Sequence, residues 1–290
     1  MMNRRDMLSL VAATGISSTI APATSHAALT NPRPFQIVDT NVSLFRWPFR
    51  RLPLDETKTL VAKLRSLGIA NAWAGSFEAL LHRDLRSVNA RLVSECRNYS
   101  ELTPVGSINP TLPRWEAELG RCLDVHTMKV IRLHPNYHGY TLDDSRFHSI
   151  LKRTGSAGCS VQIAVAMEDA RTQNEQLRVA DVDLAPLPEA MGKTRPARVQ
   201  LLNYRPRGPL LEKLAGTPGV YFDTARVDGT DGIPKLVRAV PPGRVLFGSH
   251  APFLIPEAAL IRVHESDQLA EDALRRIYFT NSAGFASGQA

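Results

Sequence analysis

The sequence predicts an α/β protein of the (β/α)8, or TIM-barrel, class. Short apolar runs alternate with amphipathic segments from Phe35 onward, and eight such units follow one another along the chain. A length of 290 residues with 43% hydrophobic and 22% charged residues suits one large domain better than two. An open doubly wound sheet is the alternative, but no Gly-x-Gly-x-x-Gly or phosphate-binding loop follows the first strand.

Each apolar run is of a length typical of a buried parallel strand. The expected strands are 35–39, 71–75, 102–108, 128–134, 160–166, 198–203, 220–223 and 244–248. The expected helices between them include 55–67, 85–97, 114–123, 143–153 and 209–214. Asp55 is expected to cap the first helix and Gly68 to end it. The fifth crossover, 171–197, contains Ala185-Pro186-Leu187-Pro188 and is expected to be long and irregular.

Charge indicates the kind of ligand, and cysteine content indicates whether disulfides are present. The formal net charge is +7, but the positive residues are scattered along the chain, which favours a small anionic ligand over nucleic acid. The three cysteines, Cys96, Cys122 and Cys159, are odd in number and lack metal-like spacing. We therefore expect buried free thiols and no disulfide framework.

The first residues have the order of an export signal. Asn3-Arg4-Arg5-Asp6-Met7-Leu8 resembles a twin-arginine motif, a mildly apolar stretch follows, and Ser25-His26-Ala27 supplies small residues for cleavage. We predict a signal peptide over 1–27 and a mature domain over 28–290, exported through the twin-arginine machinery to the periplasm or outside the cytoplasm, with no membrane segment after cleavage. The alternative is an ordinary N-terminus with a chance arginine pair.

Polar residues recur at the expected strand ends. Residues two apart share a face of a barrel strand, so an inward polar residue at the C-terminal end points into the mouth. The sets in phase are Ile37, Asp39 and Asn41; Val130, Arg132 and His134; Gln162, Ala164, Ala166 and Glu168; Leu201 and Asn203; and Leu246, Gly248 and His250. We expect these sets to converge, with open space beneath His250 at Gly248.

Four stretches carry a family resemblance. Asp39-Thr40-Asn41-Val42-Ser43 is similar to the Asp-x-His-x-His of the amidohydrolase-related family, and Leu246-Phe247-Gly248-Ser249-His250-Ala251-Pro252 resembles its Leu-Phe-Gly-Ser-Asp-x-Pro. Ile131-Arg132-Leu133-His134-Pro135 and Thr280-Asn281 also look like the family. The resemblance covers the chain from about Ile37 to Asn281 and implies a TIM-barrel hydrolase whose histidines and aspartate hold a divalent metal.

This chain departs from the family at each metal-binding position. Asn41 and Ser43 stand at the histidines of the first strand, Ala164 and Asn203 at those of the fifth and sixth strands, and His250 at the aspartate. One histidine among amides and a hydroxyl does not replace a set of anionic or imidazole ligands. The sequence therefore predicts neither the usual metal nor another cofactor.

What remains is a metal-free acid–base set. His250 has an unperturbed pKa near neutrality, which suits a general base, and His134 and Asp39 complete the predicted catalytic residues. We expect a hydrolase, or a lyase or decarboxylase, that acts on a small carboxylated, anionic substrate. The alternatives are a structural histidine at 250 and a packed strand-end histidine at 134.

The predicted substrate-binding residues are Arg132, Asn41, Asn203, Glu168 and Trp47. Arg132 points inward and needs a negative partner, either Asp39 or Glu168 or a substrate carboxylate. Trp47 lies in Arg46-Trp47-Pro48-Phe49-Arg50-Arg51, which is either a rim for an anionic or ring-bearing ligand or a helix-packing loop. The second function class is a catalytically inactive exported barrel that binds a ligand or a partner.

Overall fold

In the computed structural model, which describes residues 35–194, 196–265 and 267–288, the parallel strands form two sheets. The first contains β1 (Ile37–Leu44), β2 (Ile69–Ser76) and β3 (Leu102–Pro104). The second contains β4 (Gly106–Ser107), β5 (Val130–Leu133), β6 (Ser160–Ala164), β7 (Val199–Leu202), β8 (Val220–Asp223) and β9 (Val245–Leu246).

Backbone hydrogen bonds join the two sheets at both seams. The strands β3 and β4 are two halves of the predicted third strand, and between them the Val105 N–H donates to the Ala74 carbonyl at 2.8 Å. At the other seam, Thr40 N donates to Phe247 O and Ser43 N to Ala251 O, both at 2.9 Å. The arrangement is a (β/α)8 barrel with an interrupted ladder, in which β5 to β9 are the fourth to eighth strands.

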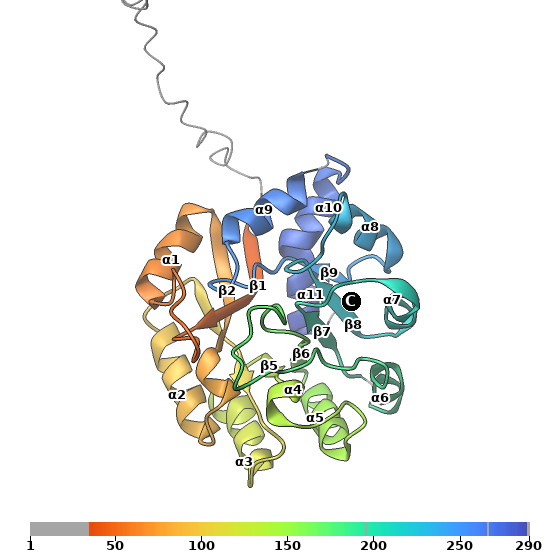
Figure 1. Ribbon diagram of the computed structural model, residues 1–290. Coiled ribbons are helices and arrows are strands. Elements are labelled where there is room, and N and C mark those ends of the chain that lie inside the picture. Colours follow the sequence, from red (N-terminus) through yellow and green to blue (C-terminus); the bar gives the residue numbers. More distant parts are fainter. Residues whose placement is uncertain (1–34, 195, 266, 289–290) are drawn as a thin grey trace, which may run out of the picture. The chain divides into compact units, whose positions relative to one another are not determined.

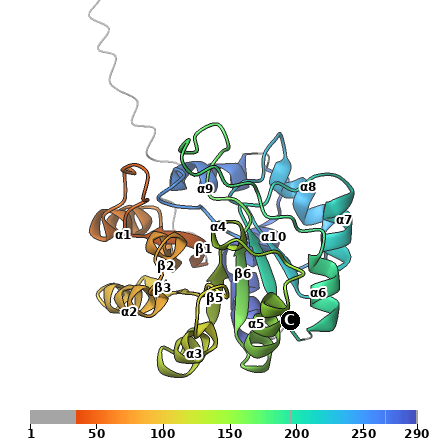
Figure 2. The same cartoon turned by 60° about the horizontal axis from the view of Figure 1, so that its bottom comes forward.

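Helices surround the strands, as Figure 1 shows for the whole ring and Figure 2 shows from a second side. The longer ones are α1 (Thr57–Ser66), α2 (Leu85–Cys96), α5 (Ser145–Ser156), α7 (Gly208–Gly216), α8 (Gly232–Ala239) and α9 (Pro256–His264). The shorter ones are η2 (Phe77–Leu80), α3 (Trp115–Gly120) with η3 (Arg121–Val125), α4 (Pro135–His138), α6 (Leu187–Lys193), α10 (Glu271–Arg275), η4 (Arg276–Thr280) and α11 (Asn281–Ser287). None of the described helices is long and apolar enough to cross a membrane.

The expected irregular crossover is confirmed. Residues 165–186 contain no helix or strand, and α6 begins only at Leu187, with Pro188 in its first turn, where a missing N–H costs nothing. The first helix differs from its prediction, because Asp55 does not cap it. The Asp55 carboxylate instead accepts from Leu52 N and from the Arg51 guanidinium.

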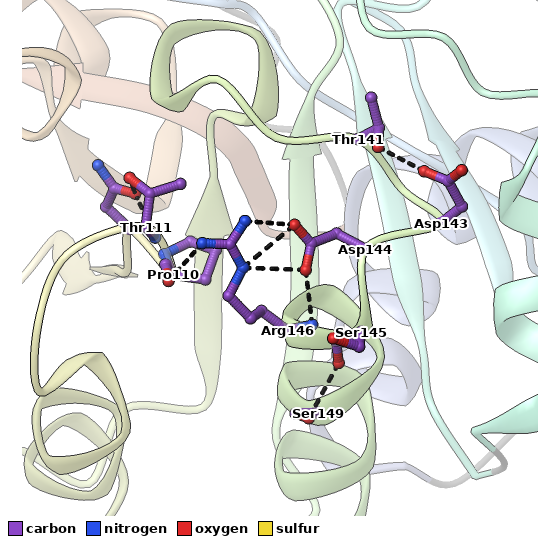
Figure 3. Close-up of polar contacts among 9 residues, drawn as sticks. Pro110, Thr111, Thr141, Asp143, Asp144, Ser145, Arg146 and Ser149 are labelled. Atoms are coloured by element: carbon purple, nitrogen blue, oxygen red, sulfur yellow. Dashed lines mark hydrogen bonds and ion pairs between the residues drawn. The ribbon is translucent and has the colours of Figure 1, made fainter.

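The start of α5 is tied to the loop after β4, as Figure 3 shows. The Asp144 side chain accepts from Arg146 N at 2.8 Å and so caps the helix. The Arg146 guanidinium pairs with the same carboxylate, and its Nη1 donates to Pro110 O at 3.5 Å. These bonds fix two neighbouring βα loops relative to each other.

The described residues form four apolar clusters, and the two largest stabilise the barrel. The larger one lies between strands and helices, and the smaller one fills the lower interior with side chains from most of the strands and from α11, namely Val38, Trp73, Val105, Val130, Tyr221, Leu246 and Phe285. The prediction that Ile37 points inward was wrong, because Ile37 belongs to the outer core and Val38 to the inner one. A register shift between Asp39 and Val42 then breaks the simple alternation along β1. The three cysteines are free and buried, as predicted.

Candidate active site

The predicted site residues lie within the strands or beyond their C-terminal ends and are buried, but in the described structure hydrogen bonds join only Asp39, Asn41, Asn203 and His250 to one another. Each is 3% exposed or less: Asp39, Asn41, Trp47, Arg132, His134, Glu168, Asn203 and His250. The strand that carries the first of them is longer than predicted. β1 runs to Leu44 rather than ending at Asp39, because its N–H groups continue to find carbonyl partners across the seam.

Asp39 is held by the segment that follows β9. Its carboxylate accepts from the Ser249 N–H at 2.9 Å, from the Ser249 hydroxyl and from the Asn41 N–H at 3.1 Å. Complete burial raises the pKa of Asp39 to about 6, and these hydrogen bonds oppose the rise. Asp39 is therefore a buried acid that titrates closer to neutrality than an ordinary aspartate.

Asn41, Asn203 and Asp223 form the centre of the cluster. The Asn41 amide donates to Asn203 Oδ1 at 2.9 Å and to Asp223 Oδ2 at 2.7 Å, and Asn203 N donates to Asp223 Oδ1 at 3.1 Å. Burial raises the pKa of Asp223 to about 7, with a further contribution from the nearby Asp39. Two carboxyl groups with raised pKa values thus lie in one buried centre.

Sequence reasoning missed Asp223. It is the last residue of β8 and stands two places after Tyr221, which points into the barrel. The alternation applied to five other strands would have placed Asp223 at the mouth.

His250 links two loops of the mouth. Its Nε2 lies 2.7 Å from Met167 O, a carbonyl that only accepts, so Nε2 carries the proton and Nδ1 faces Asn203 Nδ2 at 3.4 Å. Phe253 stacks on the ring with centroids 5.1 Å apart. Burial lowers the pKa of His250 to about 3, so the ring is neutral at physiological pH. This geometry fits the structural alternative, and the general-base role stays a prediction.

The backbone around the cluster is strained. His250 and Asn203 have φ values of 58° and 60°, in the left-handed region that residues other than glycine seldom adopt. The left-handed turn at Asn203 brings its side chain into the cluster, although Leu201 packs in the outer core. The prediction of open space beneath His250 was wrong: a Cβ at Gly248 would lie 2.9 Å from Asp223 Oδ2 and 3.0 Å from Asn41 Cβ.

Arg132 lies inside the barrel and makes different contacts from those predicted. It donates to Gln162 Oε1 and Val42 O, both at 2.9 Å, and to Ser43 Oγ at 3.2 Å. Neither predicted carboxylate pairs with it, because Asp39 is bonded to Ser249 and Glu168 to Arg50. Burial lowers the pKa of Arg132 to about 10, although the charges of Asp223 and Asp39 oppose this.

A polar layer surrounds Arg132 across the barrel. Gln162 Nε2 donates to Thr40 O at 2.7 Å and to Gln200 Oε1 at 2.8 Å, and Gln200 Nε2 donates to Thr40 Oγ1 at 2.7 Å. A Cβ at Gly75 would lie only 2.7 Å from Arg132 Nη1, so a side chain at this strand position would displace the guanidinium from its place. The contacts of Arg132 are those of a structural cation, and its substrate-binding role stays a prediction.

His134 lies just beyond β5, beside His138 of α4. The ring centroids are 5.7 Å apart, and His138 Nε2 lies 3.0 Å from Ala79 O. Within the described residues, the buried Nδ1 atoms of both histidines have no hydrogen-bond partner. Burial lowers the pKa of His138 to about 4 and that of His134 well below its usual value. An unpaired buried nitrogen is costly and marks a place where a polar ligand would gain binding energy.

The loop after β1 closes the mouth instead of forming an open rim. Trp47 is 2% exposed and makes edge-to-face contacts with Phe49, Phe77, Tyr137 and Phe253, at centroid distances of 5.1 to 6.4 Å. We call these five side chains the aromatic plug. Trp47 therefore agrees with the packing-loop alternative and not with an open rim.

Arg50 fastens the plug to the opposite loop. Its Nη1 lies 2.6 Å from Glu168 Oε1, and its guanidinium carbon lies 5.0 Å above the Phe253 ring. The Glu168 side chain is 2% exposed, whereas that of Arg50 is 42% exposed. Four surface cavities, of about 340 to 690 Å³, are lined by other described residues, and none of the eight predicted residues lines any of them. The centre is closed in this conformation.

The donor set at the mouth does not fit a divalent metal. The Asn41 and Asn203 amides are bonded to each other and to Asp223, and Ala164 offers no donor. Ser43 Oγ accepts from Arg132, a cation that would repel a metal ion. In the part of the chain that the structure describes, no group of three or more His, Cys, Asp or Glu side chains is placed to hold one.

Solved structures share this fold. A dihydroxybenzoic acid decarboxylase from a Polaromonas species, with bound manganese and 2-nitroresorcinol, matches with a TM-score of 0.69 and 12% identity over 87% of this chain and 97% of that one. A 5-carboxyvanillate decarboxylase from Sphingomonas paucimobilis matches with a TM-score of 0.65 and 12% identity, over 87% of this chain and 98% of that one. An uncharacterised TIM-barrel protein from Bordetella bronchiseptica matches with a TM-score of 0.65 and 15% identity, over 88% of this chain and 100% of that one. Such low identities show the fold alone.

The sequence comparisons differ in their outcome. A search of curated proteins found no match. The model of the amidohydrolase family, in contrast, matches residues 48–285. That match spans most of the barrel, including Arg132, Asp223 and His250, and begins after β1 and Trp47. The protein therefore belongs to the amidohydrolase family.

Proposed function

We propose that the protein is an enzyme that acts on a small carboxylated substrate by acid–base chemistry, without a divalent metal. The observation that carries the proposal is the pair Asp39 and Asp223, two buried carboxyls in one hydrogen-bonded centre with pKa values near 6 and 7. A catalytic acid or base works best when its pKa lies close to the working pH. Family membership and a fold shared with decarboxylases of hydroxybenzoates and carboxyvanillate support a carboxylated substrate.

Decarboxylation is the reaction that these groups fit best. The bond between the carboxylate and its neighbouring carbon breaks, CO2 leaves, and the electron pair stays on that carbon. The carbon then takes the proton of Asp223, and water returns a proton to the carboxylate. Hydrolysis is the alternative, in which His250 or an ionised carboxylate takes a proton from water as water attacks an acyl carbon.

Entry of a substrate requires the plug to move. Because all of the predicted residues are buried, the substrate must displace the loop that carries Trp47 and break the contact between Arg50 and Glu168. His134 and Trp47 both present buried polar atoms without partners in the described structure, which a bound carboxylate or hydroxyl would satisfy. Expulsion of water from the closed site would strengthen every electrostatic contact within it.

One observation favours the second function class, an inactive barrel that binds a ligand. Both ring nitrogens of His250 face polar groups of the protein, so neither is available to a substrate in the closed state. A silent binding protein would bind carboxylates without converting them. The two classes therefore differ in turnover and not in affinity.

The test is a screen of aromatic carboxylates and lactones, followed by CO2 release and product formation. We expect turnover of at least one carboxylate, and we expect Asp223→Asn to lower it by about two to four orders of magnitude, as for loss of a positioned acid. Asp228→Asn, which changes an exposed aspartate, is the matched control. Binding without turnover across the screen would favour the silent barrel, and full activity of a folded Asp223→Asn variant would overturn the assignment of Asp223.

A further inference from the structure

One of the four surface cavities lies between α2 and α3, away from the proposed catalytic centre. Its volume is about 350 Å³, in the range of small-molecule sites. The loops that form it follow β2 and β4, so it opens at the same end of the barrel as the mouth. It shares no lining residue with the cluster of Asp39, Asp223 and His250.

The floor of this cavity is apolar. Leu85, Ile108 and Trp115 line it and are at most 9% exposed, and Leu112 is partly buried beside them. Trp115 also packs into the outer core, which fixes its ring. A ligand that covers this floor would gain from removing the apolar surface from water.

The rim of the cavity is cationic. Four arginines line it against two carboxylates: Arg83, Arg86, Arg114 and Arg121 against Asp84 and Glu118. Both carboxylates are engaged elsewhere, since Asp84 accepts from Ser87 N at 3.2 Å to cap α2 and Glu118 accepts from Asn89 Nδ2 at 2.9 Å.

Three of these arginines have no strong partner of their own. Arg121 lies 3.8 Å from Glu118, but Arg83, Arg86 and Arg114 form no ion pair within 4.0 Å with any residue that the structure describes. Most solvated arginines contribute nothing specific, but here three exposed arginines without an ion pair in the described structure line one cavity with an apolar floor. Charge complementarity at such a site favours an anion.

The wall of the cavity is held in place before any ligand binds. In the loop after β4, Asn109 Oδ1 accepts from Thr111 N at 2.9 Å and from Thr111 Oγ1 at 2.7 Å. Arg146 reaches Pro110 O from the start of α5, as Figure 3 shows. A wall fixed in this way reduces the entropy lost on binding.

We propose that this cavity is a second binding site, specific for a small organic anion with an apolar body, such as an aromatic or medium-chain carboxylate. The apolar body covers Leu85, Ile108 and Trp115, and the anionic group lies among Arg83, Arg86 and Arg114. The site is independent of the proposed catalytic function, because neither the cavity nor its ligand involves a residue of the barrel mouth.

The probe is 1-naphthoate, an aromatic carboxylate, titrated into the full-length mature chain by calorimetry and by tryptophan fluorescence. We expect one site that binds naphthoate at least tenfold more tightly than the neutral 1-naphthalenemethanol, and binding that weakens as salt screens the arginines. Trp115→Phe should abolish the fluorescence change and retain the calorimetric signal, because Phe preserves the floor.

The decisive variant changes Arg83, Arg86 and Arg114 together to Gln. We expect it to weaken naphthoate binding about tenfold, in keeping with three partly exposed charge contacts, without affecting the neutral probe. Arg97, Arg178 and Arg275 changed together to Gln remove the same charge elsewhere and should leave binding unchanged.

Three results would overturn the proposal: no binding of naphthoate to the folded protein, equal affinity for the neutral probe, or equal loss in the two triple variants. A separate control, the Asp223→Asn variant, tests whether naphthoate binds at the catalytic centre instead. If naphthoate binding is lost in Asp223→Asn and kept in the arginine variant, then the ligand occupies the barrel mouth instead.

Discussion

Asp223 and Asp39 are the side chains on which the proposed chemistry depends. A buried carboxylate loses its hydration, so its neutral form is favoured and its pKa rises, as for both groups here. The hydrogen bonds from Asn41 and Ser249 work in the opposite direction. The balance leaves acids that change protonation state near neutral pH, which is where a proton-transfer enzyme needs them.

This shift predicts how stability depends on pH. Because the pKa of Asp223 is raised to about 7, its contribution to stability is complete below the ordinary aspartate pKa and is lost as pH rises through about 7. Relative to Asp223→Asn, the wild type should therefore lose on the order of 3 kcal/mol of unfolding free energy between pH 5 and pH 8. Chemical denaturation of both proteins from pH 5 to pH 8 measures this difference in unfolding free energy. A difference that does not vary with pH would mean that Asp223 titrates normally.

His250→Gln separates the catalytic role of His250 from its structural one. Gln can still donate to Met167 O, so we expect the variant to fold. If His250 moves a proton when the plug opens, then turnover of an identified substrate should fall by about two to four orders of magnitude. Steady-state kinetics and thermal unfolding of the same preparation distinguish the catalytic role from the structural one. Near wild-type turnover places the base elsewhere, and an unfolded variant supports the purely structural role.

At the scale of single residues, the sequence located most of the cluster but not its bonding. Their position at the ends of predicted parallel strands was enough to place Asp39, Asn41, Asn203 and His250 together, because the C-terminal ends of the strands meet at one mouth of a barrel. The partners of Arg132 could not be predicted, since they are carbonyls and an amide from other strands. Two left-handed residues, Asn203 and His250, also aim their side chains in ways that strand alternation does not describe.

Among the structural elements, the loop after β1 decides whether the centre is open. The sequence places aromatic and basic residues there but cannot say whether they face solvent or one another. In the structure Trp47 is at the centre of the plug, and Arg50 joins the plug to Glu168 in the loop after β6. Closure thus depends on contacts between segments more than a hundred residues apart.

Removing the Arg50 contact should loosen the plug. We expect Arg50→Gln to raise amide hydrogen exchange in residues 45–54 roughly fivefold, equivalent to about 1 kcal/mol for a half-exposed ion pair. Arg51→Gln is the matched control, because Arg51 pairs with Asp55 within its own loop. Exchange measured by mass spectrometry should differ between the two variants. Equal exchange would show that the aromatic contacts alone hold the loop.

At the scale of the whole molecule, the barrel prediction is confirmed. Eight alternating units predicted the strand order, and helix boundaries such as those of α2 and α5 fall within a few residues of their expected positions. The division of the third strand into β3 and β4 was not predicted, because Val105 is as apolar as its neighbours and its pairing depends on Ala74. Local pattern fixes element type, whereas tertiary hydrogen bonding sets where each strand ends.

Export is a property of the full-length chain that stays a prediction, since the expected signal over 1–27 lies outside the described residues. We expect Arg4→Lys combined with Arg5→Lys to leave the precursor in the cytoplasm, because the motif is read through its arginine pair. Cell fractionation with an immunoblot measures this, with Arg97→Lys as a control. Normal export of the double variant would rule out the twin-arginine route.

We propose that hydrogen-bonded amides and carboxyls replace a metal centre at the barrel mouth. Elemental analysis of the mature protein, purified without chelators and dialysed, tests it most directly. With Asn41, Ser43, Ala164, Asn203 and His250 at the ligand positions, we predict zinc, iron and manganese well below one ion per chain. One tightly bound ion per chain, lost together with activity on changing Asp39, Asp223 or His250, would contradict the account.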